Sequence, residues 1–423
     1  MSRIAIIHFP GTTGVPTVQR ALTAVGLGHN RVLWNNLDGL DQYDAFILPA
    51  GFSYGDRIRP GVVAAHTPMI QALKQAAQRG KPILGIGNGC QILIEAGLLP
   101  GVSPGVLAGA TTLNVRKQAQ DIIGVGLHHS KVYLKHVAPE RRTAFTAGLD
   151  TSTIIAGRVA DGAGNFIFSE ELTLELEHNQ QILFKYCTEQ GAVLNDFPTN
   201  PNGAMWGIAG LCNPAGNVVG YIPELERDEQ GTAIMAGLQR SLTQSFVPKT
   251  ESLQWQPDTI TIKRYHPSVE SLDIYVSSSQ SQYSARMAET MLQRYGFQVQ
   301  VHCQQYWEIW HDVEKSQVEL FTKTLVRSGM LLDDSIEQYH FEKTPPPNTV
   351  NILVRNINDY EGKYVAEQLR HKYSIMGIGN IMKGTIWELS FPNVPAAEHM
   401  NLVGQILQTY ILYNPYAQEC MVM

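Results

Sequence analysis

The sequence of 423 residues has few cysteines, no long apolar run and no excess of basic residues. Its five cysteines are scattered and form no CxxC pair, which argues against a disulfide framework and a zinc site and suits a reducing compartment. No apolar stretch is long enough to span a bilayer. The first apolar run is interrupted by His8 and Pro10, so it predicts a buried strand rather than a signal peptide. We therefore expect a cytoplasmic protein that does not bind membranes, metals or cofactors.

The charge balance also limits the partners. Lys and Arg number 32 against 38 Asp and Glu, which gives a net charge of −6 and no basic stripe. We expect no nucleic-acid binding from such a chain. The glycines of Gly85–Gly89 form neither a GxxxxGK[ST] nor a GxGxxG pattern, so nucleotide binding is not expected either. The length predicts two or three domains.

The first part of the chain alternates short apolar runs with amphipathic segments. Strands are predicted at Ile4–Phe9, Ala45–Leu48 and Ile83–Ile86, and helices at Val15–Val25, Met69–Arg79 and from Gln91–Ala96 onward. This alternation is typical of an α/β fold with helices on both faces of a mostly parallel sheet. From about Thr111 longer β-rich segments follow, among them Lys131–Val137, Ile182–Tyr186 and Val218–Ile222, before a helix that contains Ala233–Ser241. Ligands of such sheets bind at the carboxyl ends of the strands.

The tail contains an internal repeat. Four groups of residues recur in the same order at an offset of about 78–81 residues. The pairs are Leu272–Val276 with Asn351–Val354, Ala288-Glu289 with Ala366-Glu367, Trp307–Ile309 with Trp387–Leu389, and Leu331–Asp333 with Leu412–Asn414. The pattern predicts strand–helix–strand–helix–strand, twice. We predict domains at 1–245, 271–343 and 349–423, with a polar, proline-containing linker at 246–270.

Three segments of the first part of the chain carry a specific pattern: Pro49–Asp56 (PAGFSYGD), Gly80–Pro100 (GKPILGIGNGCQILIEAGLLP), and Asn200–Asn213 continuing to Pro223–Arg227. These segments resemble the glutaminase subunit of phosphoribosylformylglycinamidine synthase. With the opening strand, the resemblance covers most of residues 1–240. It implies a type 1 glutamine amidotransferase fold, flavodoxin-like with a mostly parallel, doubly wound sheet, and a Cys-His-Glu triad. The two small α+β domains would follow in tandem.

The triad implied by this resemblance is incomplete. The nucleophile belongs in the pattern Gly-Ile-Cys-Asn-Gly, where this chain has Gly87 in place of the cysteine. The base and its orienting carboxylate belong in Pro-His-Pro-Glu-Arg, which here reads Pro-Glu-Leu-Glu-Arg with Glu224 and Glu226. Hydrolysis of an amide through a covalent intermediate needs a thiolate and an imidazole that accepts its proton. We therefore expect no glutaminase activity.

The flanking scaffold is retained. Gly51, Asn88, Gly89 and Gln91 keep the residue types of a glutamine and oxyanion pocket. A nucleophile elbow strains its residue by about 1–3 kcal/mol, and glycine relieves this strain. Gly87 is thus a stabilising replacement where the reaction is no longer needed.

Cys90 is the alternative nucleophile. It would lie at the start of a helix, where the thiol pKa is lowered. No histidine in Pro223–Arg227 could activate it, so we expect a buried, packing role. His8, His128 and His129 are expected to be structural, since adjacent histidines on a strand face opposite ways.

A second family signature has lost its polar residues. The segment Ala-His-Gly-Glu-Gly-Arg-Phe, implied near the junction with the synthetase, reads Ala160–Phe166 (ADGAGNF) here. The tail resembles the small bridging subunit of the same synthase, in Gly377–Leu389 and Leu412–Pro415. A tandem copy would supply both halves of a dimer covalently, at high effective concentration.

Three functions remain open. The first is a non-hydrolytic scaffold that docks an ATP-dependent synthetase subunit. The second is an active glutaminase with rewired residues that uses Cys90. The third is a regulatory module that binds glutamine without hydrolysing it.

Overall fold

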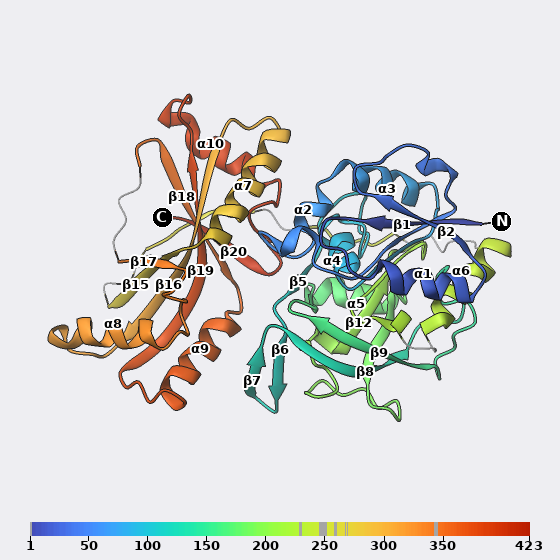
Figure 1. The fold of residues 1–423 in the computed structure, drawn as a ribbon, viewed down its shortest axis with the longest axis horizontal. Coiled ribbons are helices and arrows are strands. Elements are labelled where there is room, and N and C mark those ends of the chain that lie inside the picture. Colours follow the sequence, from blue (N-terminus) through green and yellow to red (C-terminus); the bar gives the residue numbers. More distant parts are fainter. Residues whose placement is uncertain are drawn as a thin grey trace. The chain divides into compact units, whose positions relative to one another are not determined.

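The chain forms two compact units, Met1–Asp258 and Thr259–Met423 (Figure 1). The structure is a computed structural model and describes residues 2–227, 231–244, 252–257, 260–266, 268, 270–341 and 346–423. Of the predicted linker 246–270, residues 246–251, 258–259, 267 and 269 lie outside the described residues. Residues 342–345, at the predicted boundary between the repeats, lie outside them as well. No helix of the described ranges is long and apolar enough to cross a bilayer.

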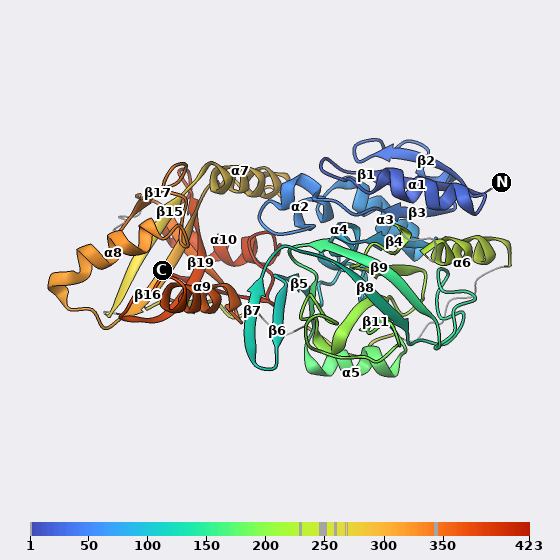
Figure 2. The same ribbon diagram turned by 60° about the horizontal axis from the view of Figure 1, so that its bottom comes forward.

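The first unit is built from β-strands and helices (Figure 2). Its strands are β1 (Arg3–His8), β2 (Gly28–Leu33), β3 (Ala45–Leu48), β4 (Ile83–Ile86), β5 (Ala110–Thr112), β6 (Val115–Gln118), β7 (Asp121–Val125), β8 (His128–His136), β9 (Ile154–Asp161), β10 (Asn165–Ile167), β11 (Ile182–Cys187), β12 (Ile208–Cys212) and β13 (Val218–Tyr221). Its α-helices are α1 (Val15–Ala24), α2 (Val62–Ala65), α3 (Pro68–Gln78), α4 (Asn88–Glu95), α5 (Glu170–His178) and α6 (Thr232–Thr243). Short 3-10 turns lie at Leu40–Gln42, Ser53–Asp56, Met205–Gly207 and Leu225–Arg227.

Nine strands form the central sheet, in the order β2-β1-β3-β4-β13-β12-β11-β8-β9. The pairs from β2 to β13 are parallel, and those from β13 to β9 are antiparallel. The predicted α/β fold class is confirmed, with the detail that the sheet is mixed. The β-rich segments that begin near Thr111 supply the antiparallel half of this sheet and also two separate two-stranded sheets, β10-β5 and β6-β7.

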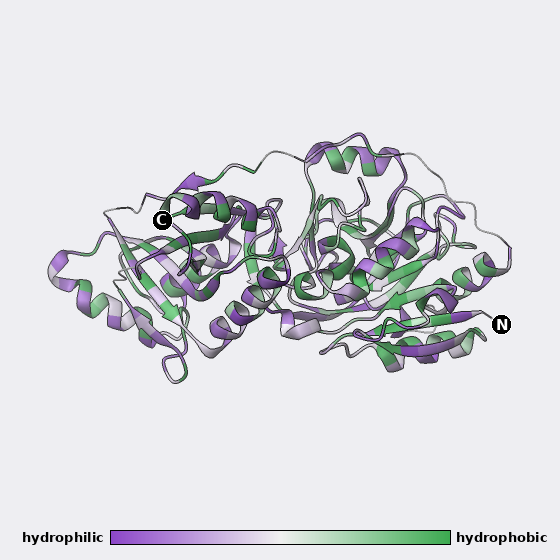
Figure 3. Cartoon of the chain, turned by 90° about the horizontal axis from the view of Figure 1, so that it is seen from above, coloured by the Kyte–Doolittle hydropathy of each residue, from purple (hydrophilic) through white to green (hydrophobic). Residues whose placement is uncertain are grey.

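Side chains alternate between two cores, one on each face of this sheet. Along β1, Ile4 and Ile6 pack with α1 and α6, whereas Ala5 and Ile7 pack with α2, α3, α4 and α5. This follows from the period of two in a strand, which sends successive side chains to opposite faces. Because both faces are covered, the strands read as continuous apolar runs. The helices, by contrast, carry hydrophilic and hydrophobic residues side by side (Figure 3).

The second unit repeats one order of elements. The first copy is β15 (Ser271–Ser277), α7 (Ser279–Arg294), β16 (Gln300–His311), α8 (Val318–Arg327) and β17 (Gln338–His340). The second copy is β18 (Thr349–Asn356), α9 (Tyr360–His371), β19 (Ile378–Ser390), α10 (Ala396–Leu407) and β20 (Gln418–Val422). A short strand β14 (Lys263–Arg264) and a 3-10 turn at Lys315–Gln317 complete the unit.

Both copies contribute to one seven-stranded sheet, in the order β14-β20-β18-β19-β16-β15-β17. The two long strands β16 and β19 pair antiparallel at its centre. Trp307 lies opposite Lys383, and Trp387, its counterpart in the repeat, lies opposite Cys303. The centre of the unit thus has an approximate twofold arrangement.

A buried ion pair joins the copies on this sheet. Arg355 on β18 donates to Glu308 on β16 at 2.6 Å, and both side chains are at most 5% exposed. The guanidinium also lies over the rings of Tyr265 and Tyr306. Such a pair adds little net stability over apolar packing, but it favours one arrangement of the two copies because a mispaired sheet would bury an unpaired charge.

Candidate functional site

Gly87 forms a sharp turn between β4 and α4. Its φ of 53° and ψ of −114° lie in a region that side chains disfavour and glycine tolerates. The turn is fixed by hydrogen bonds, since Gly87 N–H donates to Tyr221 O at 2.8 Å and Gln91 N–H donates to Gly87 O at 3.1 Å. The strained elbow geometry is therefore present with glycine at its apex.

A side chain at this apex would lie between two other loops. An added Cβ at Gly87 would be 3.1 Å from Ala50 Cβ and 3.5 Å from Ile222 O. Ala50 follows β3 and Ile222 follows β13. These three strand ends meet at the edge where ligands of parallel sheets bind. The space beside Gly87 thus corresponds to the place of a nucleophile.

The neighbouring glycines allow close packing of α4 on the sheet. An added Cβ at Gly89 would collide with the carbonyl oxygen of Leu48 on β3. At Gly85 it would lie 2.6 Å from Gly89 O. Glycine at these positions is a consequence of how near the helix lies to β3 and β4.

The loop after β3 has a strained backbone. Gly51 has φ 152°, and an added Cβ there would lie 2.6 Å from Gly11 O. Tyr54, Asp56 and Ile58 all have φ between 52° and 68°, which costs about 1–3 kcal/mol each. Strain of this kind persists only where the surroundings hold it, and it is concentrated at functional loops.

A buried clamp holds this loop against α4. Arg59 donates through Nε to one oxygen of Glu95 and through a terminal nitrogen to the other, each at 2.7 Å. The two side chains are 10% and 2% exposed. A two-bond guanidinium–carboxylate contact fixes orientation as well as distance.

Asn88 and Gln91, predicted to belong to a glutamine pocket, are bonded to their own chain. Asn88 accepts from Ser53 N–H at 2.9 Å and donates to Asp56 at 3.2 Å and to Gln91 Oε1 at 2.9 Å. Gln91 in turn donates to Ala163 O at 2.8 Å. A ligand that used these amides would have to replace contacts that already exist.

Glu224, at the position of the base, makes an ion pair. Its carboxylate accepts from Arg227 Nε at 2.7 Å. Its main chain forms an isolated antiparallel bridge with Arg158 on β9, in which Glu224 N–H donates to Arg158 O at 2.7 Å. The residue is thus fixed in place, and it offers a carboxylate paired with Arg227 where the family pattern has an imidazole.

Glu226, at the predicted position of the orienting carboxylate, is buried. It is 6% exposed, and no other described residue hydrogen-bonds to either of its carboxyl oxygens. Burial, together with the charge of Glu224, raises the pKa of Glu226 to about 8. This is the arrangement expected for a carboxyl group whose imidazole partner is missing.

Two further carboxyl groups are perturbed. Burial and the charge of Asp161 raise the pKa of Asp56, in the GFSYGD segment, to about 7. Burial raises the pKa of Asp161 to about 6, although Asn114 and Asn202 donate to it at 2.9 and 3.2 Å. Asp161 stands where the second family signature has its histidine, and its interactions here are structural ones within the chain.

Cys90, the alternative nucleophile, is buried. It is 0% exposed, and burial raises the pKa of its thiol well above the ordinary value. An added Cβ at Gly220 on β13 would lie 2.6 Å from Cys90 Sγ, so the sulfur packs against that strand. These observations favour a packing role.

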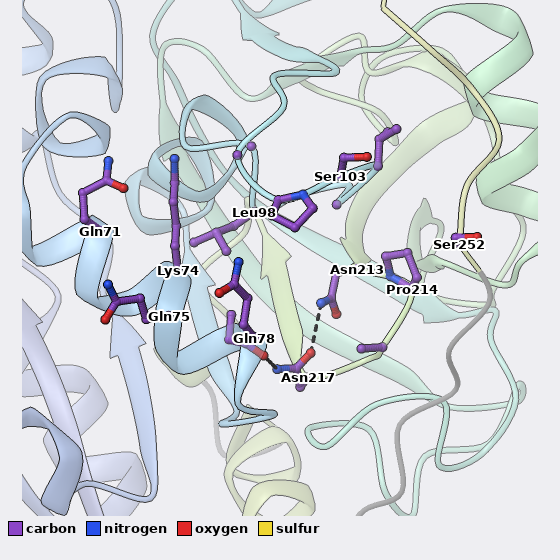
Figure 4. Close-up of a pocket in the computed structure, with 17 residues that line it drawn as sticks. Gln71, Lys74, Gln75, Gln78, Leu98, Ser103, Asn213, Pro214, Asn217 and Ser252 are labelled. Atoms are coloured by element: carbon purple, nitrogen blue, oxygen red, sulfur yellow. Dashed lines mark hydrogen bonds between the residues drawn. The ribbon is translucent and has the colours of Figure 1, made fainter.

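The described part of the first unit includes two cavities of different size. The larger, of about 590 Å³, is lined by α3, by residues 97–105 and by the turn between β12 and β13 (Figure 4). None of the described site residues lines it. Among the described lining residues the one cation is Lys74, whose pKa is lowered by burial. Asn217, one of several amides in the lining, is bonded to Asn213 and Ala77.

The smaller cavity, of about 280 Å³, includes Glu224, at the predicted position of the base. It is lined by Arg20, His129, Arg158, Ala160, Glu224 and Arg227. Of these, only Glu224 was singled out as a site residue by sequence, and His129 was expected to be structural. Arg20 and Arg158 lie in no motif, so nothing in the sequence connects them with Glu224. Among the described residues, no group of three or more His, Cys, Asp and Glu could hold a metal ion.

Comparisons with known proteins show similarity over the first unit. Residues 1–245 match the model of the family described as "CobB/CobQ-like glutamine amidotransferase domain". The chain is similar to phosphoribosylformylglycinamidine synthase subunit PurQ from Methanothrix thermoacetophila, with 39% identity over 53% of this chain and 86% of that protein. It is 40% identical to the PurQ subunit of Aquifex aeolicus, over 46% of this chain and 77% of that one. Among solved structures, a chain of PurLQS from Thermotoga maritima matches with 29% identity and a TM-score of 0.45, over 57% of this chain and 99% of that one.

Proposed function

We propose that this chain, which belongs to the CobB/CobQ-like glutamine amidotransferase family, is a non-hydrolytic member of it. The chain is a homologue of PurQ, a subunit of phosphoribosylformylglycinamidine synthase in purine biosynthesis. Its role would be structural or regulatory, in a complex like that synthase. The second unit would be a fusion of two copies of a small bridging subunit. The domain limits 1–245, 271–343 and 349–423 belong to this proposal.

The elbow at Gly87 carries the proposal. The turn has the dihedral angles of a nucleophile position, yet its residue has no side chain. Glu224 is held by Arg227, and Glu226 is buried without an imidazole to orient. Glutamine hydrolysis by this family's chemistry uses a thiolate and an imidazole base, and Gly87 and Glu224 supply neither group.

The hydrogen bonds of Asn88 and Gln91 favour a structural role for the chain over a role as a glutamine-binding sensor. Both amides are engaged with Ser53, Asp56 and Ala163. The close packing of Gly89 and the strain at Gly51 are explained by the fold alone. Glutamine as a non-hydrolysed ligand remains the second candidate, since the loop that would form its pocket is still clamped in place by Arg59.

The partner we propose is an ATP-dependent synthetase subunit, which would take ammonia from solution or from another source. One of the solved relatives is described as PurLQS, which supports assembly of a PurQ-type subunit with others. The test is co-purification of the tagged chain from its native cells, followed by mass spectrometry. Recovery of a synthetase supports the proposal. Recovery of the chain alone, at a concentration where PurQ-type complexes persist, would contradict it.

The activity itself is tested by an ammonia assay. The purified chain should release no ammonia from glutamine above a control without protein, because the thiol and imidazole are missing. Turnover that disappears on Cys90→Ser would establish the rewired glutaminase instead. Calorimetric titration with glutamine separates the remaining two functions, since only the sensor gives a saturable heat.

A further inference from the structure

The smaller cavity beside Glu224 is built from three separate parts of the first unit. Arg20 comes from α1, His129 and Arg158 from the β8–β9 pair, and Glu224 and Arg227 from the segment after β13. In the register of β8 and β9, His129 lies opposite Ala160, which is two residues from Arg158. Residues opposite one another, and residues two apart, share a face of the sheet. The hairpin therefore presents a histidine and an arginine to the same space.

The main chain fixes the base of the cavity. The bridge between Arg158 and Glu224 ties β9 to the segment after β13. Glu224 is 7% exposed, so its carboxylate is largely withdrawn from water. Arg20, His129, Arg158 and Arg227 are exposed, although Arg227 donates to Glu224 and Arg20 to Thr17.

Positive charge exceeds negative charge in the cavity lining. Three guanidinium groups face one carboxylate, and that carboxylate is bonded to Arg227. Neither Arg20 nor Arg158 has an ion-pair partner in the part of the chain that the structure describes. Among the described residues, two guanidinium groups thus lack an ion-pair partner at the edge of one small cavity.

We propose that this cavity binds a phosphate group, either as free phosphate or as a small phosphate monoester. Guanidinium groups match the oxygens of phosphate with paired N–H donors, and three of them can surround a tetrahedral anion. His129 offers a further ring N–H donor. A cavity of about 280 Å³ lies at the lower end of small-molecule sites, which suits a small anion better than a large cofactor.

Glu224 acts in this site as an internal counter-ion. It occupies Arg227 while the cavity is empty, and it opposes an entering anion by charge repulsion. The residue that stands at the base position thus sets the strength of anion binding. This role does not depend on whether the chain hydrolyses glutamine, and its test measures binding alone.

The experiment is calorimetric titration of the full chain with inorganic phosphate at constant ionic strength, with chloride as the exchanged anion. We expect one saturable site per chain. Arg158→Gln should weaken binding at least ten-fold, and Glu224→Gln should strengthen it several-fold because Arg227 is released. Arg31→Gln, an exposed arginine on β2 outside the cavity, is the matched control and should leave binding unchanged.

Titrations with two other anions identify the kind of ligand. Glycerol 3-phosphate that binds more tightly than inorganic phosphate assigns the site to a monoester, and the reverse order assigns it to free phosphate. Malonate that binds as tightly as either would overturn the phosphate assignment. So would a titration without saturation, or equal affinity of Arg158→Gln and the unaltered chain. Arg20→Gln provides a second test should Arg158→Gln lower the unfolding temperature.

Discussion

Burial of the Glu226 carboxyl group lowers the free energy of unfolding by an amount that depends on pH. Burial raises its pKa from 4.5 to about 8, so between these values the folded chain keeps a proton that the unfolded chain releases. The unfolded state then binds fewer protons, and the free energy of unfolding falls as pH rises through this range. Asp56 and Asp161, with pKa values raised to about 7 and about 6, add to the same trend. The first unit should therefore be more stable at mildly acidic than at alkaline pH.

Glu226→Gln should remove part of this dependence. The amide is neutral at every pH, so the variant should gain on the order of a few kcal/mol at pH 8 and little at pH 5. Thermal unfolding of both chains from pH 5 to 9 measures the effect. Glu171→Gln, an exposed glutamate on α5, serves as the control. Parallel curves for Glu226→Gln and the unaltered chain would show that Glu226 is ionised and paired when folded.

Restoration of the triad tests whether the elbow is an intact relic. A thiol in Gly87→Cys alone should keep a pKa near its free value of about 8.5, and Glu224 nearby disfavours the thiolate. Adding Glu224→His supplies the base, with Glu226 placed to orient it. The double variant should form a covalent adduct with a glutamine-analogue chloroketone far faster than either single variant, as followed by mass spectrometry.

The control for that experiment changes the room available to the side chain of residue 87. The new Cβ would lie 3.1 Å from Ala50 Cβ, so Ala50→Gly in the same background should ease the fit and raise the labelling rate. Cys90 is buried and should remain unlabelled throughout. Equal labelling of Gly87→Cys and the double variant would mean that residue 224 does not face the elbow.

At the scale of elements, apolar runs in the sequence predicted the strands that are buried in the structure. The strands at Ala45–Leu48 and Ile83–Ile86 were predicted to the residue, because both are fully buried between helices. β2 (Gly28–Leu33) was missed, since His29, Asn30 and Arg31 give this edge strand no apolar signal. The start of α4 was placed three residues late, because glycines in a sequence indicate a turn, whereas here Gly89 lies inside the helix for reasons of packing.

Gly89→Ala tests that packing. The added methyl would meet the Leu48 carbonyl, which cannot move without disturbing β3, so we expect a loss of about 1–3 kcal/mol in the first unit. Gly404→Ala in α10 is the contrasting change in the second unit, where nothing lies within 4 Å of the new atom. It should gain about 0.5–1 kcal/mol from helix propensity. Denaturant unfolding measures both, and a neutral Gly89→Ala would disprove the tight contact between α4 and β3.

Only part of the candidate site could be predicted from the sequence. Motifs located Gly87, Glu224 and Glu226, because each occupies a position that a family pattern defines. The cavity could not be predicted, since Arg20, Arg158 and Arg227 lie in three separate parts of the sequence and meet only through the fold. A pattern along the chain detects residues that share a segment, whereas a binding site is made of residues that share a space.

At the scale of the whole molecule, the second unit should be an independent monomer. Residues 259–423, expressed alone, should fold without forming a dimer, because β16 and β19 already pair with each other. A single half should be unfolded or dimeric, since it would leave the edge of its longest strand unpaired. Light scattering and circular dichroism of the three fragments decide this. An obligate dimer of residues 259–423, or a half that folds stably as a monomer, would count against pairing within one chain.

The pairing of β16 with β19 has a genetic consequence. In a symmetric dimer of identical chains, every substitution is expressed on both sides of the dyad. Here the two sides are encoded by separate codons, and the copies have diverged: Ser277 stands where the second copy has Arg355, so the ion pair with Glu308 occurs once rather than twice. Selection can therefore alter one half of this interface while the other half keeps its sequence.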